Sequence, residues 1–257
     1  MAGTIALVGS GEFTPAMSEV DRRLLADTGK ARPSVAIVPA ASWPDGEPVY
    51  ERWMAEGLAH FSDLDSDPFP IRLRDAATAN DRATLGRLDD ADLIYFSGGK
   101  PGYLLALLRG TEAGAALLRA RARGAVIAGC SAGAMVLGSH QLTAGGLRAI
   151  KPVAWQPSLG FVPGIVVVPH YDAIPEAVLM PLILAAPAGD LVVGIDENTA
   201  LVGRGGVWQV EGLARVTVWD RSRRKRRRAG SAPFRLAAYH AAAQRGRTGG
   251  QAGVGAG

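Results

Sequence analysis

One serine in the sequence stands in a pattern typical of a hydrolase nucleophile. The segment Gly129-Cys130-Ser131-Ala132-Gly133 fits G-x-S-x-G, in which the serine lies on a strained turn between a strand and a helix. Glycine is needed on both flanks, because side chains there would collide with the neighbouring strand and helix. The hydroxyl would then lie at a helix N-terminus, where N–H groups and the helix dipole favour an oxyanion. The pattern therefore predicts that Ser131 attacks a carbonyl carbon.

Two neighbouring features bear on this prediction. Cys130 is a rival nucleophile, but shifting the pattern by one residue loses both glycines, so we interpret Cys130 as a small buried residue. His170 follows Ser131 by 39 residues and ends the apolar run GIVVVPH, which places it at the same sheet edge as a candidate general base. The remaining histidines lie in helical or loop stretches and are interpreted as surface or packing residues: His60, His140 and His240.

A catalytic histidine needs a group that orients it, and the sequence narrows the choice. Residues 132–169 contain no Asp or Glu, so this carboxylate does not lie between the serine and the histidine. Asp172 would have to fold back, whereas Asp196 and Glu197 close the next strand and point to opposite sides of it. The residues alone leave the choice open among five candidates: Asp172, Glu176, Asp190, Asp196 and Glu197.

An oxyanion needs two preorganised N–H donors. One is the amide of Ala132, and the other could come from Gly98 or Gly99 in the turn SGGKPG, where the absence of side chains lets a ligand approach. An ordinary tight turn would explain the same glycines. Gly9-Ser10-Gly11 lacks the third glycine of a dinucleotide fingerprint, and no CxxC, HExxH or acidic cluster is present. We therefore expect neither a cofactor nor a metal.

These residues require a sheet whose strand ends meet at one edge. Continuous aliphatic runs that alternate with helix-like segments predict a parallel sheet covered on both faces by helices, an α/β fold. A hairpin is expected at the sheet edge from Trp208–Val210 and Arg215–Trp219, with Glu211-Gly212 between them. The predicted strands are Thr4–Val8, Val35–Val38, Phe69–Leu73, Leu93–Phe96, Val126–Ala128, Ile165–Val168 and Leu191–Ile195. The predicted helices are Met17–Thr28, Val49–Phe61, Asn80–Leu88, Gly102–Arg109, Ala113–Arg123 and Pro175–Leu184.

The composition of the chain excludes several classes of protein. The chain has 257 residues, 48% of them hydrophobic and 20% charged, which excludes global disorder. A single cysteine excludes an intrachain disulfide framework and fits a reducing cytoplasm. No basic stretch precedes the short apolar run near the N-terminus, so we expect neither a signal peptide nor a membrane span.

Positive charge is concentrated at the C-terminal end. Residues 221–257 hold ten of the 28 Lys and Arg and no Asp or Glu, which leaves 18 basic against 24 acidic residues in 1–220. We expect a single domain over 1–220, followed by a solvated basic loop at Arg221–Arg228, a short helix at Arg235–Gln244 and a disordered Gly/Ala-rich end. The basic run has no interleaved aromatic platform, so we expect no nucleic-acid binding.

Five segments in order, LVGSGEFTPAM, FSGGKPGYLL, IAGCSAGAMVLG, VVPHY and GIDENTAL, resemble the peptidase E/cyanophycinase family of serine peptidases over roughly residues 3–220. The resemblance implies a three-layer sandwich with a mostly parallel central sheet, similar to class I glutamine amidotransferases (flavodoxin-like). It also implies a Ser-His-Glu triad of Ser131, His170 and Glu197, with the pair Gly98-Gly99 giving the second oxyanion donor. The reaction implied is hydrolysis through an acyl-enzyme.

The sequence departs from the family around the histidine. VVPHYDAIPEAVLMPLILAAP contains no Arg or Lys, and Val168-Pro169 stands where cyanophycinases have an acidic-amide pair, so aspartyl or cyanophycin specificity stays open. We expect a cytoplasmic hydrolase of short peptides or isopeptides that forms a homodimer. The alternatives are hydrolysis of a non-peptide amide or ester, and a weakly active protein that works by binding. The expected substrate contacts are Gly11, Glu12, Lys100 and Tyr171.

Overall fold

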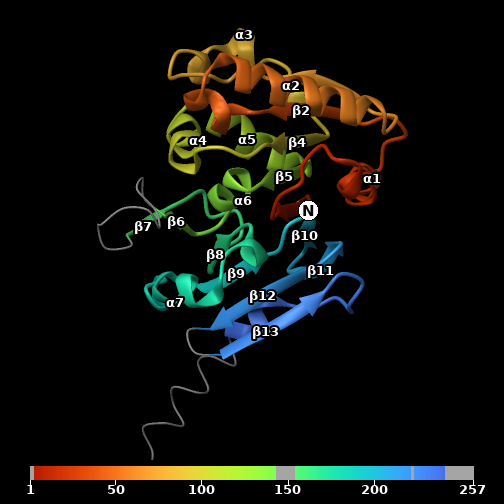
Figure 1. Ribbon diagram of the computed structural model, residues 1–257. Helices are drawn as coiled ribbons and strands as arrows, with labels where there is room; N and C mark the ends of the chain where they lie inside the picture. Colours follow the sequence, from red (N-terminus) through yellow and green to blue (C-terminus); the bar gives the residue numbers. More distant parts are fainter. Residues whose placement is uncertain (1–2, 143–153, 221–222, 241–257) are drawn as a thin grey trace, which may run out of the picture.

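The computed structural model describes residues 3–142, 154–220 and 223–240, and these form two β-sheets (Figure 1). The strands of the first sheet are, in spatial order, β11 (Val207–Gly212), β10 (Thr199–Arg204), β1 (Ile5–Val8), β5 (Val126–Cys130), β4 (Leu93–Phe96), β2 (Ser34–Val38) and β3 (Asp67–Pro70). Those of the second sheet are β13 (Arg223–Arg228), β12 (Arg215–Asp220), β9 (Leu191–Ile195), β8 (Ile165–Val168), β6 (His140–Leu142) and β7 (Trp155–Pro157).

The first sheet is the middle of three layers. Strands β1, β5, β4, β2 and β3 are parallel, and their side chains alternate between two apolar clusters, one on each face. Helices α1 (Ser18–Asp27) and α2 (Glu47–Ser62) cover one face. Helices α4 (Pro101–Leu108), α5 (Glu112–Arg123) and α6 (Ala132–Leu137) cover the other, with the short α3 (Arg82–Leu85) beside α5. This confirms the expected α/β sandwich with a mostly parallel central sheet.

Strands β8 and β9 have the predicted bounds but belong to the second sheet, which corrects the expectation of a single one. The place beside β1 is taken by β10, which pairs with it antiparallel. Val167 and Val193 join the same apolar cluster as Ile127 of β5, so one core lies between the two sheets. Helix α7 (Glu176–Leu184) covers the other face of the second sheet. No helix in the described ranges is long and apolar enough to cross a membrane.

The expected hairpin between residues 208–210 and 215–219 is wrong. Strand β11 pairs with β10, and β12 pairs with β9 and β13, so the two runs lie in different sheets. The actual turn between β10 and β11 is Gly205-Gly206, with φ of 58° and 80°. Two consecutive positive φ angles suit the tight turn of a hairpin, and glycine adopts them without strain.

The basic segment is a strand where we expected a solvated loop. β13 runs antiparallel to β12 at the edge of the second sheet, and Arg224 and Arg226 form ion pairs with Glu176 of α7. Farther along, Phe234 is buried and bridges to Trp208. A domain boundary at residue 220 would separate β12 from its hydrogen-bonded partner β13. Residues 236–240 are helical and Arg235 is not, whereas residues 241–244 of the predicted helix and the Gly/Ala-rich end lie outside the described residues.

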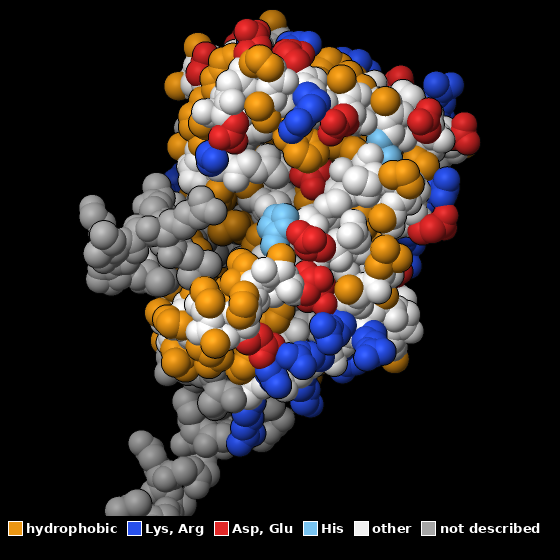
Figure 2. All heavy atoms as spheres, viewed as in Figure 1, with side chains coloured by type: hydrophobic (Ala, Val, Ile, Leu, Met, Phe, Trp, Pro, Cys, Tyr) orange, Lys and Arg blue, Asp and Glu red, His pale blue; other side chains and the backbone are white. Residues whose placement is uncertain are grey.

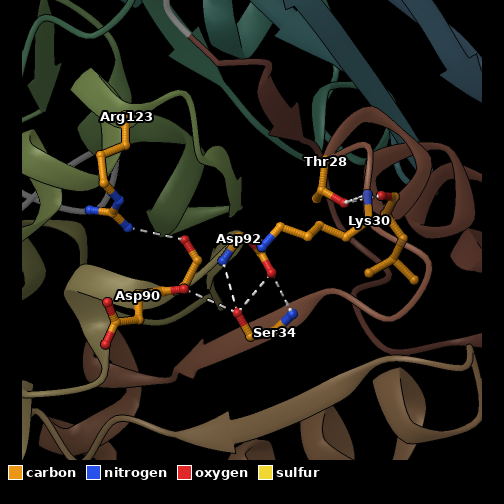
Figure 3. Close-up of polar contacts among 8 residues, drawn as sticks. Thr28, Lys30, Ser34, Asp90, Asp92 and Arg123 are labelled. Atoms are coloured by element: carbon orange, nitrogen blue, oxygen red, sulfur yellow. Dashed lines mark hydrogen bonds and ion pairs between the residues drawn. The ribbon is translucent and has the colours of Figure 1, made fainter.

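A polar cluster ties the starts of β2 and β4 together, at the edge of the sheet where the parallel strands begin (Figure 3). The backbone N–H and the hydroxyl of Ser34 both donate to Asp92 Oδ2, at 2.9 and 3.0 Å, and Lys30 Nζ lies 3.3 Å from Asp92 Oδ1. Burial alone would raise the pKa of the Asp92 carboxyl, but the hydrogen bonds from Ser34 and the Lys30 ammonium outweigh it and lower the pKa.

We expect Asp92→Asn to lower the free energy of unfolding by about 1–2 kcal/mol at pH 7, because an ionised acceptor of several hydrogen bonds is lost. Since the folded-state pKa of Asp92 is lowered, its stabilisation is complete above the unfolded-state pKa of about 3.9 and is lost as the pH falls through the folded-state value. Urea denaturation of both proteins should therefore show a difference that shrinks as the pH falls from about 4 to about 2. A difference that stays constant over this range would contradict the assignment.

Candidate active site

Ser131 lies on the turn between β5 and α6, with φ 49° and ψ −107°, a conformation that costs a non-glycine residue energy. The flanking glycines make this turn possible. A Cβ at Gly129 would lie 2.4 Å from the carbonyl carbon of Gly133, and a Cβ at Gly133 would lie 2.6 Å from the carbonyl oxygen of Phe96. These collisions are the ones expected from the sequence pattern, and they hold the serine at the carboxyl end of the central strand.

Three side chains from distant parts of the chain meet at this edge. Ser131 Oγ lies 3.0 Å from His170 Nε2, and His170 Nδ1 lies 3.0 Å from Glu197 Oε1. His170 follows β8 and has a left-handed backbone, while Glu197 lies in the short link between β9 and β10. The side chains of His170 and Glu197 are 40% and 45% exposed, so the constellation is open to solvent. Figure 2 shows a histidine beside carboxylates at the centre of one face, next to a hollow in the surface.

The other candidate carboxylates have different partners. Asp172 Oδ1 accepts the backbone N–H of Glu197 at 2.8 Å, so it holds the segment that carries Glu197. Asp196 is buried beside Arg215, with 3.2 Å between Oδ2 and Nε, and burial raises its pKa. Asp190 lies against His140, and Glu176 accepts from Tyr171. Among the five, Glu197 is the one at His170.

Two other histidines also contact carboxylates, but without a serine. His60 Nε2 lies 2.8 Å from Asp21 Oδ2 in the interior, and His140 Nδ1 lies 2.7 Å from Asp190 Oδ2. Neither histidine has a hydroxyl among its hydrogen-bond partners in the described residues. A histidine–carboxylate pair alone therefore does not single out a site in this chain, whereas the contact with a strained serine does.

Cys130 points away from this constellation into the core. It is fully buried, and its thiol donates to Glu12 Oε2 at 2.8 Å. Burial raises the pKa of the thiol well above its ordinary value, and the charge of Glu12 adds to this effect. Because the thiolate is the nucleophilic form, this environment disfavours thiol chemistry.

The turn between β4 and α4 lies next to the serine. A Cβ at Gly98 would be 3.8 Å from Ser131 Oγ, but the Gly98 N–H already donates to Glu12 Oε1 at 2.8 Å. Gly99 has φ 138°, and a Cβ there would lie 2.3 Å from the carbonyl oxygen of Ala41. The N–H groups of Gly99 and Ala132 have no hydrogen-bond acceptor within the described parts of the chain. Of the two glycines, Gly99 is the one whose N–H is left for a ligand.

The four residues expected to contact the substrate lie in different surroundings. Glu12 and Tyr171 are 7% and 4% exposed, and the Tyr171 hydroxyl accepts from Trp219 Nε1 and donates to Glu176. Gly11 packs so closely on Asn198 that a Cβ would lie 2.2 Å from its amide oxygen. Lys100 is exposed but forms an ion pair with Asp45. The interior roles of Glu12 and Tyr171 have no signal in the sequence, because a polar residue after a strand is equally compatible with an exposed position.

Comparison with known proteins finds a matching family model and similar sequences. Residues 5–210 match the model of peptidase family S51. The chain is 26% identical over 225 residues to cyanophycinases of Trichormus variabilis and of a Nostoc species, covering 84% of this chain and 73% of each relative.

Two solved structures are similar to this one. One is the crystal structure of a peptidase from an acI-B1 actinobacterium, with a TM-score of 0.82 and 31% identity over 92% of this chain and 98% of that one. The other is a putative peptidase E protein from Listeria monocytogenes, which shares the fold with a TM-score of 0.61 and 20% identity over 83% of this chain and 100% of that one. With four fifths of its length matched by the family model, the chain belongs to peptidase family S51 and is a serine-type peptidase.

Proposed function

We propose that Ser131, His170 and Glu197 form a catalytic triad that hydrolyses amide bonds of short peptides or isopeptides through an acyl-enzyme. The observation that carries this proposal is the continuous hydrogen-bonded chain from the hydroxyl through both imidazole nitrogens to the carboxylate, with 3.0 Å at each contact. It joins a strained serine to a base and the base to an orienting group, which is the arrangement that activates a weak nucleophile.

The reaction follows from the placement of these groups. Ser131 Oγ attacks the carbonyl carbon while His170 Nε2 takes its proton. The Glu197 carboxylate accepts a hydrogen bond from the His170 Nδ1–H and stabilises the imidazolium. The N–H groups of Gly99 and Ala132 donate to the oxyanion of the tetrahedral intermediate. His170 then gives its proton to the leaving amine, and water attacks the acyl-enzyme with His170 again as the base.

Short peptide or isopeptide substrates are what the resemblance to peptidase E and cyanophycinase implies. The apolar run after His170 lacks basic residues in the sequence, but β13 brings Arg224 and Arg226 against Glu176 at the start of α7. These two arginines are already paired, so they do not by themselves select an acidic substrate.

An active-site probe tests the chemistry before the substrate is known. We expect a fluorophosphonate to label Ser131 alone, because only an activated serine reacts, and iodoacetamide to leave Cys130 unmodified in the folded protein. Cys130→Ala should still be labelled at Ser131, because the buried thiol is not the nucleophile. Peptide mapping identifies the labelled residue, and Ser131→Ala is the matched control.

Two outcomes of the labelling experiment would contradict these expectations. An unlabelled parent would contradict the triad, and a folded but unreactive Cys130→Ala would indicate thiol chemistry. A peptide library that includes N-terminal aspartyl and β-aspartyl dipeptides would then define the substrate.

A further inference from the structure

The carboxylate of Glu12 lies under the proposed catalytic centre and contacts both elements that build it. Its Oε2 accepts the thiol of Cys130, the residue before Ser131, at 2.8 Å. Its Oε1 accepts the N–H of Gly98, the residue before Gly99, at 2.8 Å. One side chain thus links the end of β5 to the turn after β4. These are the two segments that present the nucleophile and a proposed oxyanion donor.

This placement is built into the loop that carries Glu12. Gly11 and Phe13, on either side of it, have φ of 82° and 63°, so the chain twists sharply on both sides of Glu12. Such a conformation is costly for phenylalanine and persists only where the surroundings enforce it. The Phe13 ring is enclosed by other aromatic rings, with centroids 5.1 Å from that of Tyr95 and 6.2 Å from that of Phe61. The packed ring fixes the loop and turns Glu12 inward.

The carboxylate also lacks the partner that a buried charge usually has. No Lys, Arg or His forms an ion pair with Glu12 among the residues that the structure describes. Burying a carboxylate without a cation is costly, and an apolar side chain of similar size would fill the space at less cost. Stability alone therefore does not account for a glutamate here, whereas its two contacts beside the reactive centre do.

We infer that Glu12 is a positioning residue that sets the distance between the Gly99 N–H and Ser131 Oγ. The inference rests on the proposed triad and extends it to a residue that touches no reacting atom. The space is tight: a Cβ at Gly98 would lie 3.0 Å from Glu12 Oε1 and 3.4 Å from Ser131 Cβ. Without the carboxylate, the Gly98–Gly99 turn can shift relative to the serine. An oxyanion donor acts only within about 2.7–3.1 Å of the oxyanion, so a shift of about 1 Å weakens transition-state binding without weakening substrate binding.

The experiment compares three substitutions in the full-length chain. Glu12→Met keeps the side-chain length but removes both acceptors, and it should lower kcat by about 10–10³-fold with KM changed by less than about threefold. Glu12→Gln keeps an oxygen for the Gly98 N–H and should lose several-fold less activity than Glu12→Met. Asp21→Asn is the matched control, because Asp21 is a fully buried carboxylate of the same core that contacts His60 and not the turn. It should lower the melting temperature and leave kcat near the parent value.

A transition-state analogue supplies a readout that a merely structural role would not move. The affinity of a peptide boronate should fall in Glu12→Met by the same factor as kcat/KM, since both depend on the oxyanion donors. The inference is overturned if folded Glu12→Met turns over like the parent, if Glu12→Gln is as impaired as Glu12→Met, or if Asp21→Asn loses kcat equally. Should Glu12→Met not fold, Glu12→Ala and the Glu12→Gln comparison decide by the same criteria. Loss of probe labelling at Ser131 in the parent would instead refute the proposed triad, and this inference with it.

Discussion

Ser131→Ala and His170→Ala are each expected to lower kcat by about 10⁴–10⁶-fold, and the double variant is expected to be hardly worse than either. Serine is a weak nucleophile at its free pKa, so the hydroxyl is of little use without the base, and the base has nothing to activate without the hydroxyl. In the proposed triad, the 3.0 Å contact between Ser131 Oγ and His170 Nε2 couples the two groups, so they are expected to act as one unit. Single-turnover kinetics with a substrate from the library, or probe-labelling rates for His170→Ala, measure the effect.

His140→Ala is the matched control for this prediction, because His140 also forms a hydrogen bond with a carboxylate but with no serine among the described residues. Its kcat should stay near that of the parent. Multiplicative losses in the double variant would mean that the serine and the histidine act independently, which contradicts the triad.

Replacement of the third member should produce the second large effect. Glu197→Gln is expected to lower kcat by about 10²–10⁴-fold, because the amide can present the wrong hydrogen-bonding group to His170 Nδ1 and cannot stabilise the imidazolium. The loss should be smaller than that for the serine or the histidine, since Glu197 does not touch the substrate. KM should change little, as the carboxylate acts on the transition state.

Two neighbouring carboxylates serve as controls. Asp172→Asn removes a charge from the side chain that accepts the Glu197 N–H, and Asp196→Asn removes the partner of Arg215. Both should lower kcat less than Glu197→Gln does. If Glu197→Gln labels as fast as the parent while either control is inactive, the orienting carboxylate is misassigned.

The parts of the site that could be predicted are those set by local chemistry. Glycine is needed on both sides of Ser131 because a Cβ there would collide with neighbouring backbone atoms, and this need can be recognised from a short run of consecutive residues. His170 follows an uninterrupted aliphatic run, so its place at a strand end could be predicted as well. The choice of Glu197 over Asp196 could not be made from alternation alone. It came from the family resemblance, because the orientation of a strand end depends on what the strand packs against.

The parts that could not be predicted depend on pairing between distant segments. β10 occupies the position beside β1 that a simple alternation of strands and helices would give to β8 or β9. Arg223–Arg228 has the composition of a solvated loop, yet it completes an antiparallel pair with β12. At an edge strand the side chains stay exposed while the backbone pairs, so charge does not prevent strand formation. The inward direction of Glu12 likewise follows from the packing of Phe13 rather than from its own neighbours in the sequence.

The link between β9 and β10 connects the two sheets, so the proposed hydrolysis depends on how the two sheets pack against each other. Ser131 belongs to one sheet and His170 to the other, while Glu197 lies in the three residues that cross between them. Neither sheet carries all three residues of the proposed triad. A small slip along their shared apolar interface would separate the hydroxyl from its base while both sheets kept all their hydrogen bonds. If the proposed triad is correct, turnover is therefore more sensitive to the packing of the two sheets than any measure of secondary structure, and activity is expected to be lost before the protein unfolds.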